Sequence, residues 1–401
     1  MNAPQLRFVG FESQLKEINL QKIIEFKNGL NYLKSDSGET VFTIGVKNFN
    51  KKKINSSTDL EVIQLNSLPN NEFKVEKEDL LFVRSNGNKE LVGRMMYIGS
   101  ELQNTYFSGF VIRGRIKDKG VLQPLYLLYL EDMIKAKIKY LTGGTNISNL
   151  SQSILNSISL NVPNIQEQKK ISTFFTLLDQ KIEKQLEKIV KLEELNKGMM
   201  QKIFSREIRF KDEDGAEFGE WEEKLLSGIS IINPKSEPLN NEFYYIDLDA
   251  VDKGSVGVLK TVSLENAPSR AQRVLKEKDV LFQTVRPYQQ NHFYVENLYD
   301  KQTVASTGFA QIRTKQNARY VYYLMHNETF AQKVMDRCTG TSYPAIKSGD
   351  LGEINVPVPT LLEQEKISGY LSLIEKKIKI EKEKLKMLVV QKKGFMQQMF
   401  V

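Results

Sequence analysis

Two segments of the chain carry the seven-residue spacing of apolar side chains that is typical of a coiled-coil helix. They follow Asn164 and Thr360, and each contains two apolar series, interrupted once by a polar residue. In the first segment the series are Phe175, Ile182, Ile189, Asn196 and Ile203, and Ile171, Leu178, Gln185, Leu192 and Met199. In the second they are Leu371, Ile378, Leu385, Lys392 and Met399, and Ile367, Ile374, Glu381, Leu388 and Phe395. The pattern predicts two long helices whose polar layers fix the register of their pairing.

Each predicted helix begins with the sequence of a capping box. Asn164 precedes Glu167 by three residues, and Thr360 precedes Glu363 by three. The cap side chain and the Glu carboxylate are expected to accept hydrogen bonds from each other's backbone N–H groups. Forty residues at 1.5 Å per residue give a rod of about 60 Å. Because charged residues fill the remaining faces, an antiparallel pair is favoured over the alternative, in which each helix packs only against its own domain.

The chain is an internal repeat. Glu167–Ile171 returns as Glu363–Ile367, 196 residues later, and about sixty residues keep this register. Further upstream the match continues with small length changes, and Asp79–Phe82 corresponds to Asp279–Phe282. We also align Gly109-Phe110 with Gly308-Phe309, and Arg7-Phe8 with Arg209-Phe210. Repeats of this kind indicate one structural unit used twice.

Each unit opens with a domain of mixed pattern, here called a head. In the first head, alternation and β-branched or aromatic content predict strands at 41–46, 80–84, 94–98 and 107–116. A helix is predicted over 125–141, with its counterpart over 320–335, and closing strands run through Ile158, Leu160 and Val162 and through Ile354, Val356 and Val358. The fold class is therefore α+β. The predicted domains are 1–164 and 205–360 as heads, and 165–204 and 361–401 as coiled-coil helices.

Composition narrows the possible chemistry. The 401 residues include one Cys and two His, which excludes a disulfide framework and leaves too few ligands for Cys- or His-based metal sites. No phosphate-binding loop, dinucleotide fingerprint or Ser-His-Asp arrangement is present. No apolar run is long enough to span a membrane, and the first residues lack a signal-peptide core. We therefore expect a cytoplasmic, non-catalytic protein without a cofactor of its own.

Positive charge suggests a polyanionic partner without defining one face. The net charge is +8, yet the first head carries 21 basic and 16 acidic residues and the second carries 19 and 22. Phosphate contacts give affinity for nucleic acid, whereas side chains at base edges give specificity. Arg84-Ser85-Asn86-Gly87-Asn88 follows a predicted strand and offers the groups that recognise guanine and adenine. The corresponding turn of the second head carries Thr284, Arg286, Tyr288, Gln289 and Gln290, and the further basic candidates are Arg94, Arg113, Arg115 and Arg313.

The order of these features resembles the specificity subunits of type I restriction–modification systems. The resemblance rests on two variable heads that each end in a Val-Pro strand, on Glu-Gln-x-Lys-Ile at the start of each long helix, and on Leu6–Phe11, Ile208–Phe210 and Trp221. It implies that each head recognises one half of a split, asymmetric DNA target. It also implies DNA contact by the Gly/Thr loops at 142–148 and 339–345, which include Thr145, Asn146, Ser342 and Tyr343.

The same resemblance implies the partners. The long helices would set the gap between half-sites and bind two adenine-methyltransferase subunits, which use S-adenosylmethionine. Restriction and translocase subunits, which use ATP and magnesium, would join this assembly. The alternative from another class is a structural coiled-coil adaptor without sequence-specific DNA binding. Such an adaptor would not need two heads that share a framework and differ in their loops.

Overall fold

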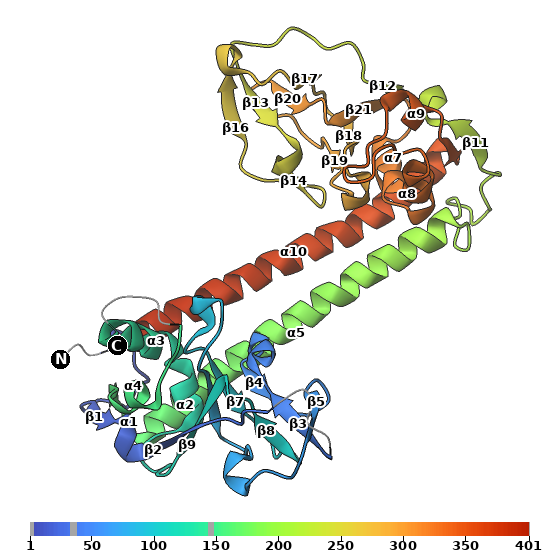
Figure 1. Ribbon diagram of the computed structural model, residues 1–401. Coiled ribbons are helices and arrows are strands. Elements are labelled where there is room, and N and C mark those ends of the chain that lie inside the picture. Colours follow the sequence, from blue (N-terminus) through green and yellow to red (C-terminus); the bar gives the residue numbers. More distant parts are fainter. Residues whose placement is uncertain (1–3, 33–37, 143–147, 401) are drawn as a thin grey trace. The chain divides into compact units, whose positions relative to one another are not determined.

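The computed structural model describes residues 4–32, 38–142 and 148–400 (Figure 1). The chain forms two units, residues 1–185 with 384–401, and residues 186–383. Both units contain parts of the two long helices, α5 (Ile165–Phe204) and α10 (Leu361–Met399). The long helices are too polar, and the apolar ones too short, to cross a lipid bilayer within the described residues.

The first unit contains the first head. Its five-stranded sheet has the order β2-β9-β6-β7-β4, its three-stranded sheet the order β5-β3-β8, and β1 pairs with β10. The strands are β1 Lys16–Asn19, β2 Ile24–Asn28, β3 Glu39–Ile44, β4 Lys53–Ile54, β5 Glu61–Leu65, β6 Leu80–Val83, β7 Met95–Ile98, β8 Thr105–Phe107, β9 Val111–Ile116 and β10 Ser159–Val162. The short helices are α1 Leu20–Ile23, α2 Pro124–Tyr129, α3 Glu131–Leu141 and α4 Gln152–Asn156.

The second unit contains the second head, which repeats this plan. Its sheets have the orders β12-β21-β18-β19 and β16-β13-β20-β17, with the pairs β11-β22 and β14-β15. The strands are β11 Glu222–Leu225, β12 Ser230–Ile232, β13 Glu242–Ile246, β14 Val251–Asp252, β15 Ser255–Val256, β16 Lys260–Ser263, β17 Ala271–Val274, β18 Val280–Gln283, β19 Phe293–Tyr294, β20 Thr303–Ser306, β21 Phe309–Thr314 and β22 Asn355–Val358. The short helices are α6 Leu226–Ile229, α7 Ala318–Met325, α8 Glu328–Met335 and α9 Ser348–Gly352.

The central strand of the larger sheet of the first head, β6, and its counterpart β18 in the second head are buried on both faces. In β6, Leu80 and Phe82 pack with the helices, while Leu81 and Val83 face the second sheet. In β18, Phe282 and Leu281 divide in the same way between two clusters. A strand buried on both sides has a continuous apolar sequence instead of an alternating one. This explains the uninterrupted apolar run Leu80–Val83. The loops that follow these strands therefore begin at the edge of a packed core.

Three predicted elements are divided in the structure. The predicted strand over 107–116 is two strands, because β8 pairs with β3 whereas β9 pairs with β2 and β6. The predicted helix over 125–141 breaks at Leu130, where ψ is 8°. The predicted helix over 320–335 breaks at His326, and the Asn327 side chain caps α8 by accepting from the N–H groups of Thr329 and Phe330. Asparagine is a preferred N-cap residue, so the sequence carried this signal.

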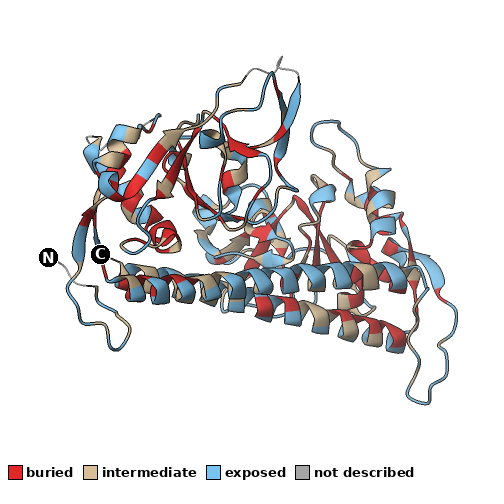
Figure 2. Ribbon diagram, turned by 90° about the horizontal axis from the view of Figure 1, so that it is seen from below, coloured by how far each residue is buried: buried red, intermediate tan, exposed pale blue. Residues whose placement is uncertain are grey.

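The two long helices pair antiparallel within each unit, as the heptads predict. In the first unit Phe174 contacts Phe395, and Lys392 of the polar layer donates to Asp179. In the second unit Lys188 donates to Glu381 over 2.9 Å. Each pair also enters a head core, with Ile171 and Met399 in the first core and Ile203 and Ile367 in the second. Buried positions are densest in the first turns of each long helix (Figure 2).

The repeated Glu-Gln motif fastens each long helix to its head. The cap half of the predicted box is confirmed, because Asn164 accepts from Glu167 N–H over 3.0 Å and Thr360 from Glu363 N–H over 3.3 Å. The Glu half is wrong. The Glu167 carboxylate instead binds the Arg7 guanidinium, and the Glu363 carboxylate binds both Arg209 and the indole N–H of Trp221.

The neighbouring glutamines complete the attachment. The Gln168 amide nitrogen donates to the carbonyls of Pro163 and Val121, and its oxygen accepts from Gln123 N–H over 2.9 Å. Gln364 donates to the Pro359 carbonyl and accepts from Asn317 N–H over 3.0 Å. All of these glutamine and glutamate side chains are buried. The motif is therefore a polar joint between a helix and a head, which we call the Glu-Gln joint.

Candidate nucleic-acid interface

The loops that follow the central strands β6 and β18 meet the loops that precede the closing strands. In the first head Leu150 N–H donates to the Arg84 carbonyl over 2.7 Å, and Ser85 bridges to Asn149. In the second head Ile346 N–H donates to the Thr284 carbonyl over 3.0 Å, and Val285 bridges to Ala345. In the second head the structure thus brings together the two loops that the sequence predicts as the DNA-contacting side. In the first head it places residues 149 and 150 beside the loop after β6, while residues 143–147 of the predicted loop lie outside the described residues. We call each combined surface the strand-end edge.

The strand registers define which residues correspond between the heads. Val83 pairs with Val111, and Gln283 pairs with Phe309. The Arg84 N–H donates to the Phe110 carbonyl over 2.8 Å, and the Thr284 N–H donates to the Gly308 carbonyl over 3.0 Å. Arg84 therefore corresponds to Thr284, and Phe110 to Gly308. The sequence alignment of Phe110 with Phe309 is wrong by one residue, because the segments before β9 and β21 differ in length.

Four of the predicted contact residues belong to the framework. The Arg113 side chain is buried, 2% exposed, and donates to the carbonyls of Glu72 and Lys74. Thr284 is buried as well, and its hydroxyl donates to the Gly308 carbonyl over 2.7 Å. The polar groups of these two residues face the interior of their heads, so the structure does not present them at the surface for the predicted DNA contact. Burial also lowers the pKa of the Arg113 guanidinium.

Arg115 and Arg313 form one repeated ion pair. Arg115 donates to both carboxylate oxygens of Asp79, over 2.7 and 2.8 Å. Arg313 donates to both oxygens of Asp279, each over 2.8 Å. The aspartates are fully buried, and the hydrogen bond to the carboxylate raises the pKa of each arginine. These guanidinium groups are already committed to a carboxylate, which holds the turn before the central strand.

Arg286 is the most constrained cation of the second strand-end edge. Its φ of 53° is left-handed, a conformation that costs a non-glycine residue free energy and is often kept at functional sites. The Arg286 N–H donates to the Pro344 carbonyl over 2.7 Å, and the guanidinium lies 4.3 Å from the centroid of the exposed Tyr343 ring. The neighbouring Ser342 is also exposed. Arg286 and Tyr343 therefore form a paired surface built from both loops.

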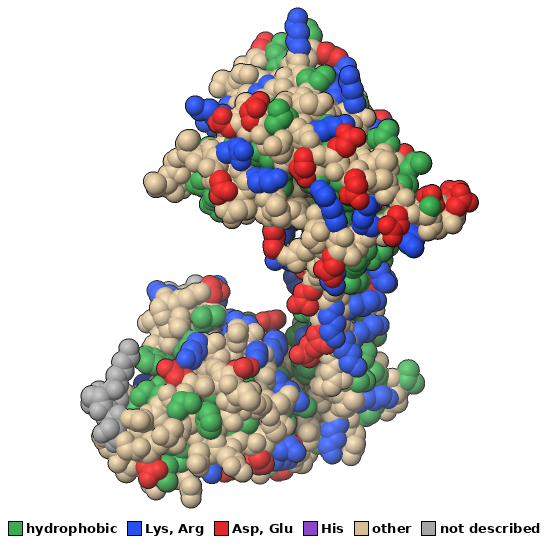
Figure 3. Space-filling model, turned by 90° about the vertical axis from the view of Figure 1, so that its right-hand side faces the viewer, with side chains coloured by type: hydrophobic (Ala, Val, Ile, Leu, Met, Phe, Trp, Pro, Cys, Tyr) green, Lys and Arg blue, Asp and Glu red, His purple; other side chains and the backbone are tan. Residues whose placement is uncertain are grey.

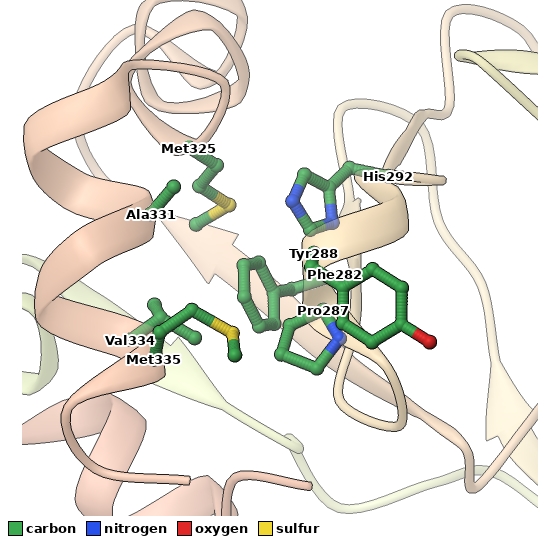
Figure 4. A pocket seen from close by; sticks show the side chains of 8 residues that line it. All are labelled: Phe282, Pro287, Tyr288, His292, Met325, Ala331, Val334 and Met335. Carbon is green, nitrogen blue, oxygen red and sulfur yellow. The ribbon is translucent and has the colours of Figure 1, made fainter. Parts of the chain in front are cut away.

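An apolar pocket lies at the base of the loop that carries Arg286. Pro287 and Tyr288 close one side of it, and the other lining residues come from β18, α7, α8 and the segment before β19: Phe282, His292, Met325, Ala331, Val334 and Met335 (Figure 4). His292 Nδ1 accepts from Gln283 N–H over 3.1 Å, and the Gln283 side chain donates to Gln289. Gln290, at φ 54°, ends the turn. The outer face of Tyr288 remains more than half exposed.

The first strand-end edge has different chemistry. Arg84 is half-buried and donates to the Gly109 carbonyl over 3.2 Å. Ser85 and Asn86 are partly exposed, Asn88 is exposed, and Asn88 caps a short turn by accepting from Glu90 N–H. Arg94 lies where this loop returns to β7. Thr145 and Asn146 lie outside the described residues.

Neither head gathers its charge into one basic face on the side shown in Figure 3, where Lys and Arg are interspersed with Asp and Glu. This agrees with a surface on which individual cations act beside hydrogen-bonding groups. No three His, Cys, Asp or Glu side chains of the described residues group into a metal site. The fold and its edges thus define a protein of two related heads that present different polar loops from one framework.

Comparisons with known proteins identify this architecture. The model of the type I restriction modification DNA specificity domain matches residues 12–194 and 220–389. The MjaVIII type I restriction enzyme specificity subunit of Methanocaldococcus jannaschii is 26% identical over 349 residues, which cover 82% of this chain and 80% of the relative. The putative MjaX specificity subunit of the same organism is 27% identical over 299 residues, covering 70% and 68%.

Solved structures show the same fold. The type I restriction–modification S subunit from M. genitalium matches with a TM-score of 0.59 at 15% identity, covering 100% of this chain and 99% of that one. A structure from work on complex assembly and conformational transition of the type I system gives 0.58 at 16% identity, covering 98% and 99%. The chain belongs to the family of type I restriction–modification specificity subunits, and its two heads are target recognition domains.

Proposed function

We propose that each head recognises one half of an asymmetric, bipartite DNA sequence through its strand-end edge. The proposal rests on one observation. Corresponding positions of the shared framework carry different side chains in the two heads. The Asp79–Arg115 and Asp279–Arg313 pairs are the same in both heads. The partly exposed positions after the strands differ, with Ser85 and Asn86 in one head and Val285 and Arg286 in the other. A pair of different edges predicts a target whose halves differ.

We further propose that the chain is non-catalytic and binds two copies of an adenine methyltransferase subunit through the long helices. Leu177 and Leu373 support this partner, since they follow the Glu-Gln joint at the same distance and are 59% and 67% exposed. Two equivalent apolar positions suit two copies of one partner. S-adenosylmethionine would be bound by that partner. ATP and magnesium would be bound by restriction and translocase subunits.

Co-expression with a candidate methyltransferase subunit tests the proposed function. We expect methylated adenines only within one split sequence when genomic DNA of the host is sequenced for modified bases. The purified chain alone is expected to show neither methylation nor cleavage of DNA. Methylation without sequence preference would support the adaptor alternative and contradict the proposed recognition of DNA.

Substitutions at the two edges test the division between heads. Arg84→Ala is expected to relax only one half of the methylated sequence, and Arg286→Ala only the other half. A bidentate base contact gives about 1–3 kcal/mol of discrimination, which corresponds to about a 5- to 150-fold loss. The readout is the affinity of the methyltransferase complex for duplexes with single base changes in each half. A change in the wrong half would contradict the assignment.

The partner surface has its own test. Leu177→Glu and Leu373→Glu are each expected to remove one methyltransferase copy, because a charged side chain in an apolar contact costs free energy. Val190→Glu is the matched control, since Val190 is exposed on α5 while its counterpart at the same repeat position is Lys386. Native mass spectrometry counts the copies. If a variant that carries both Leu177→Glu and Leu373→Glu still binds two methyltransferase copies, this surface is excluded.

A further inference from the structure

One apolar side chain is exposed at the strand-end edge of the first head. Phe110 lies in the turn between β8 and β9 and is 63% exposed. It belongs to none of the hydrophobic clusters formed by the described residues. Its carbonyl accepts from the N–H groups of Arg84 and Ser85, over 2.8 and 3.4 Å. These bonds hold the Phe110 backbone against the start of the loop after β6, which we propose contacts DNA.

The second head shows that the framework does not require an aromatic residue here. The corresponding residue, Gly308, accepts from Thr284 N–H in the same way. A Cβ atom at Gly308 would lie 2.8 Å from Leu248 Cδ1, so the protein's own side chain fills that space. Phe110 is consequently a property of the first head alone. Its exposure is not a by-product of the shared fold.

The groups around Phe110 indicate the kind of contact it makes. Arg84 donates to the Gly109 carbonyl directly before it, and Asn86 lies two residues further along the loop. Arginine and asparagine recognise guanine and adenine in the major groove. In that groove the C5-methyl group of thymine is the apolar feature of a base edge, and phenylalanine is one of the side chains that contact it.

We propose that Phe110 contacts a thymine C5-methyl group in the half-site of the first head, and that the second head lacks this contact. The inference rests on the proposed function, because it assumes that the strand-end edges face DNA. Insertion of the ring between base pairs, as minor-groove proteins do, is the competing use of an exposed aromatic residue. The two differ in whether a single methyl group matters.

Removing the methyl group from DNA tests the proposal. Each thymine of the mapped first half-site is replaced in turn by deoxyuridine, and the affinity of the complete methyltransferase complex for each duplex is measured. For the unmodified protein we expect about a fourfold loss at one thymine, the effect of one buried methyl group. Phe110→Gly, which copies the second head, should bind the thymine duplex more weakly and not distinguish it from the deoxyuridine duplex.

Two controls separate the contact from general effects. Phe110→Leu keeps an apolar side chain and is expected to keep the sensitivity to deoxyuridine. Val62→Ala truncates another exposed apolar residue of the first head, on β5, and should leave every affinity unchanged. Replacing thymines of the second half-site should have the same effect in all variants. Intact methylation at the second half-site would show that the Phe110 variants fold.

Several outcomes would overturn the inference. An equal loss by Phe110→Gly on thymine and deoxyuridine duplexes would indicate insertion or a general contact. A first half-site without thymine, or unchanged affinity of Phe110→Gly, would also contradict it. Failure of the proposed function is distinguishable, because the complex would then show no sequence-specific methylation before any Phe110 variant is made.

Discussion

Single residues of the two heads divide into those that hold the framework and those that are free to vary. The buried carboxylates of Asp79 and Asp279 take the same arginine partner in each head. One residue past the central strand, Arg84 and Thr284 already differ, although both side chains bond a carbonyl of the neighbouring turn. A specificity protein of this design can change its contacts without changing its core.

The framework arginines give a first prediction. Arg115→Ala and Arg313→Ala should each lower the free energy of unfolding by about 2–4 kcal/mol, because each leaves a buried carboxylate without its ion-pair partner. In cells that still contain folded protein, both variants should direct methylation to the same sequence as the unmodified protein. Urea unfolding and methylation sequencing are the measurements. A relaxed half-site at normal stability would return these arginines to the DNA-contacting set.

The histidines of the second head predict a dependence on pH. Burial holds the pKa of His292 well below its ordinary value of 6.5, with a further lowering by His326, and burial lowers the pKa of His326 too. Below pH 6.5 the unfolded chain therefore binds more protons than the folded chain, so stability falls as the pH is lowered and is unaffected above pH 7. The slope is up to about 1.4 kcal/mol per pH unit for each histidine.

Trp221 is the only tryptophan of the chain, and its fluorescence reports on the second head. Urea unfolding followed at pH 7.5 and 5.5 should give a smaller free energy at the lower pH. The control is the double variant His292→Gln, His326→Gln, which should be less stable at pH 7.5 but should lose less on acidification. An equal loss in both proteins would assign the effect to carboxylates elsewhere.

Among the elements, the long helices were the most predictable and the loops the least. A heptad pattern sustained over each helix determines a coiled coil, because one apolar stripe must be covered along its whole length. The same pattern could not reveal that Glu167 and Glu363 bind arginines some 150 residues away in sequence. The strand over 107–116 was predicted as one element because apolar character continues through Phe110, whose side chain is exposed. An apolar pattern in the sequence indicates burial, so it could not show that this apolar residue is exposed.

The Glu-Gln joint gives a prediction at this scale. Glu363→Ala should destabilise the second unit by about 3–5 kcal/mol, since Arg209 and the Trp221 indole N–H both lose a buried acceptor. Glu167→Ala should cost less, because the first joint lacks a tryptophan and leaves fewer donors unsatisfied. Hydrogen exchange at the first turns of α5 and α10 measures both. Equal exchange rates in the two variants would contradict the role of Trp221.

For the whole molecule, the repeat predicts that the heads are exchangeable. Residues 205–360 contain Arg209 and Trp221, which bind Glu363 of α10. Replacing them with the corresponding segment of another family member that carries the same arginine and tryptophan should keep this attachment to the helix. The expected result is a methylated sequence in which one half is new and the other is unchanged. Sequencing of modified adenines checks this, and a change in both halves would show that the heads do not act separately.

The total charge predicted little about the whole molecule. A net charge of +8 indicated a polyanionic partner, whereas the positions of the cations decide what each can do. Arg113 looked equivalent to Arg84 in the sequence, yet only the strand register shows that one points into the core. The direction of a side chain at a strand end depends on pairing partners that are distant in sequence. The sequence alone therefore could not show which arginines point into the core and which reach the surface.

The hydrogen bond from Leu6 N–H to the Gln398 carbonyl, over 3.1 Å, has a topological consequence. In the second unit, α5 continues through peptide bonds into the segment that carries Arg209, whereas in the first unit the end of α10 and the segment that carries Arg7 only touch. Each unit thus places a corresponding segment beside the end of a long helix, through peptide bonds in the second unit and through this hydrogen bond in the first. A circularly permuted chain, with residues 400 and 4 linked and new ends at 205 and 206, should therefore fold into the same two units.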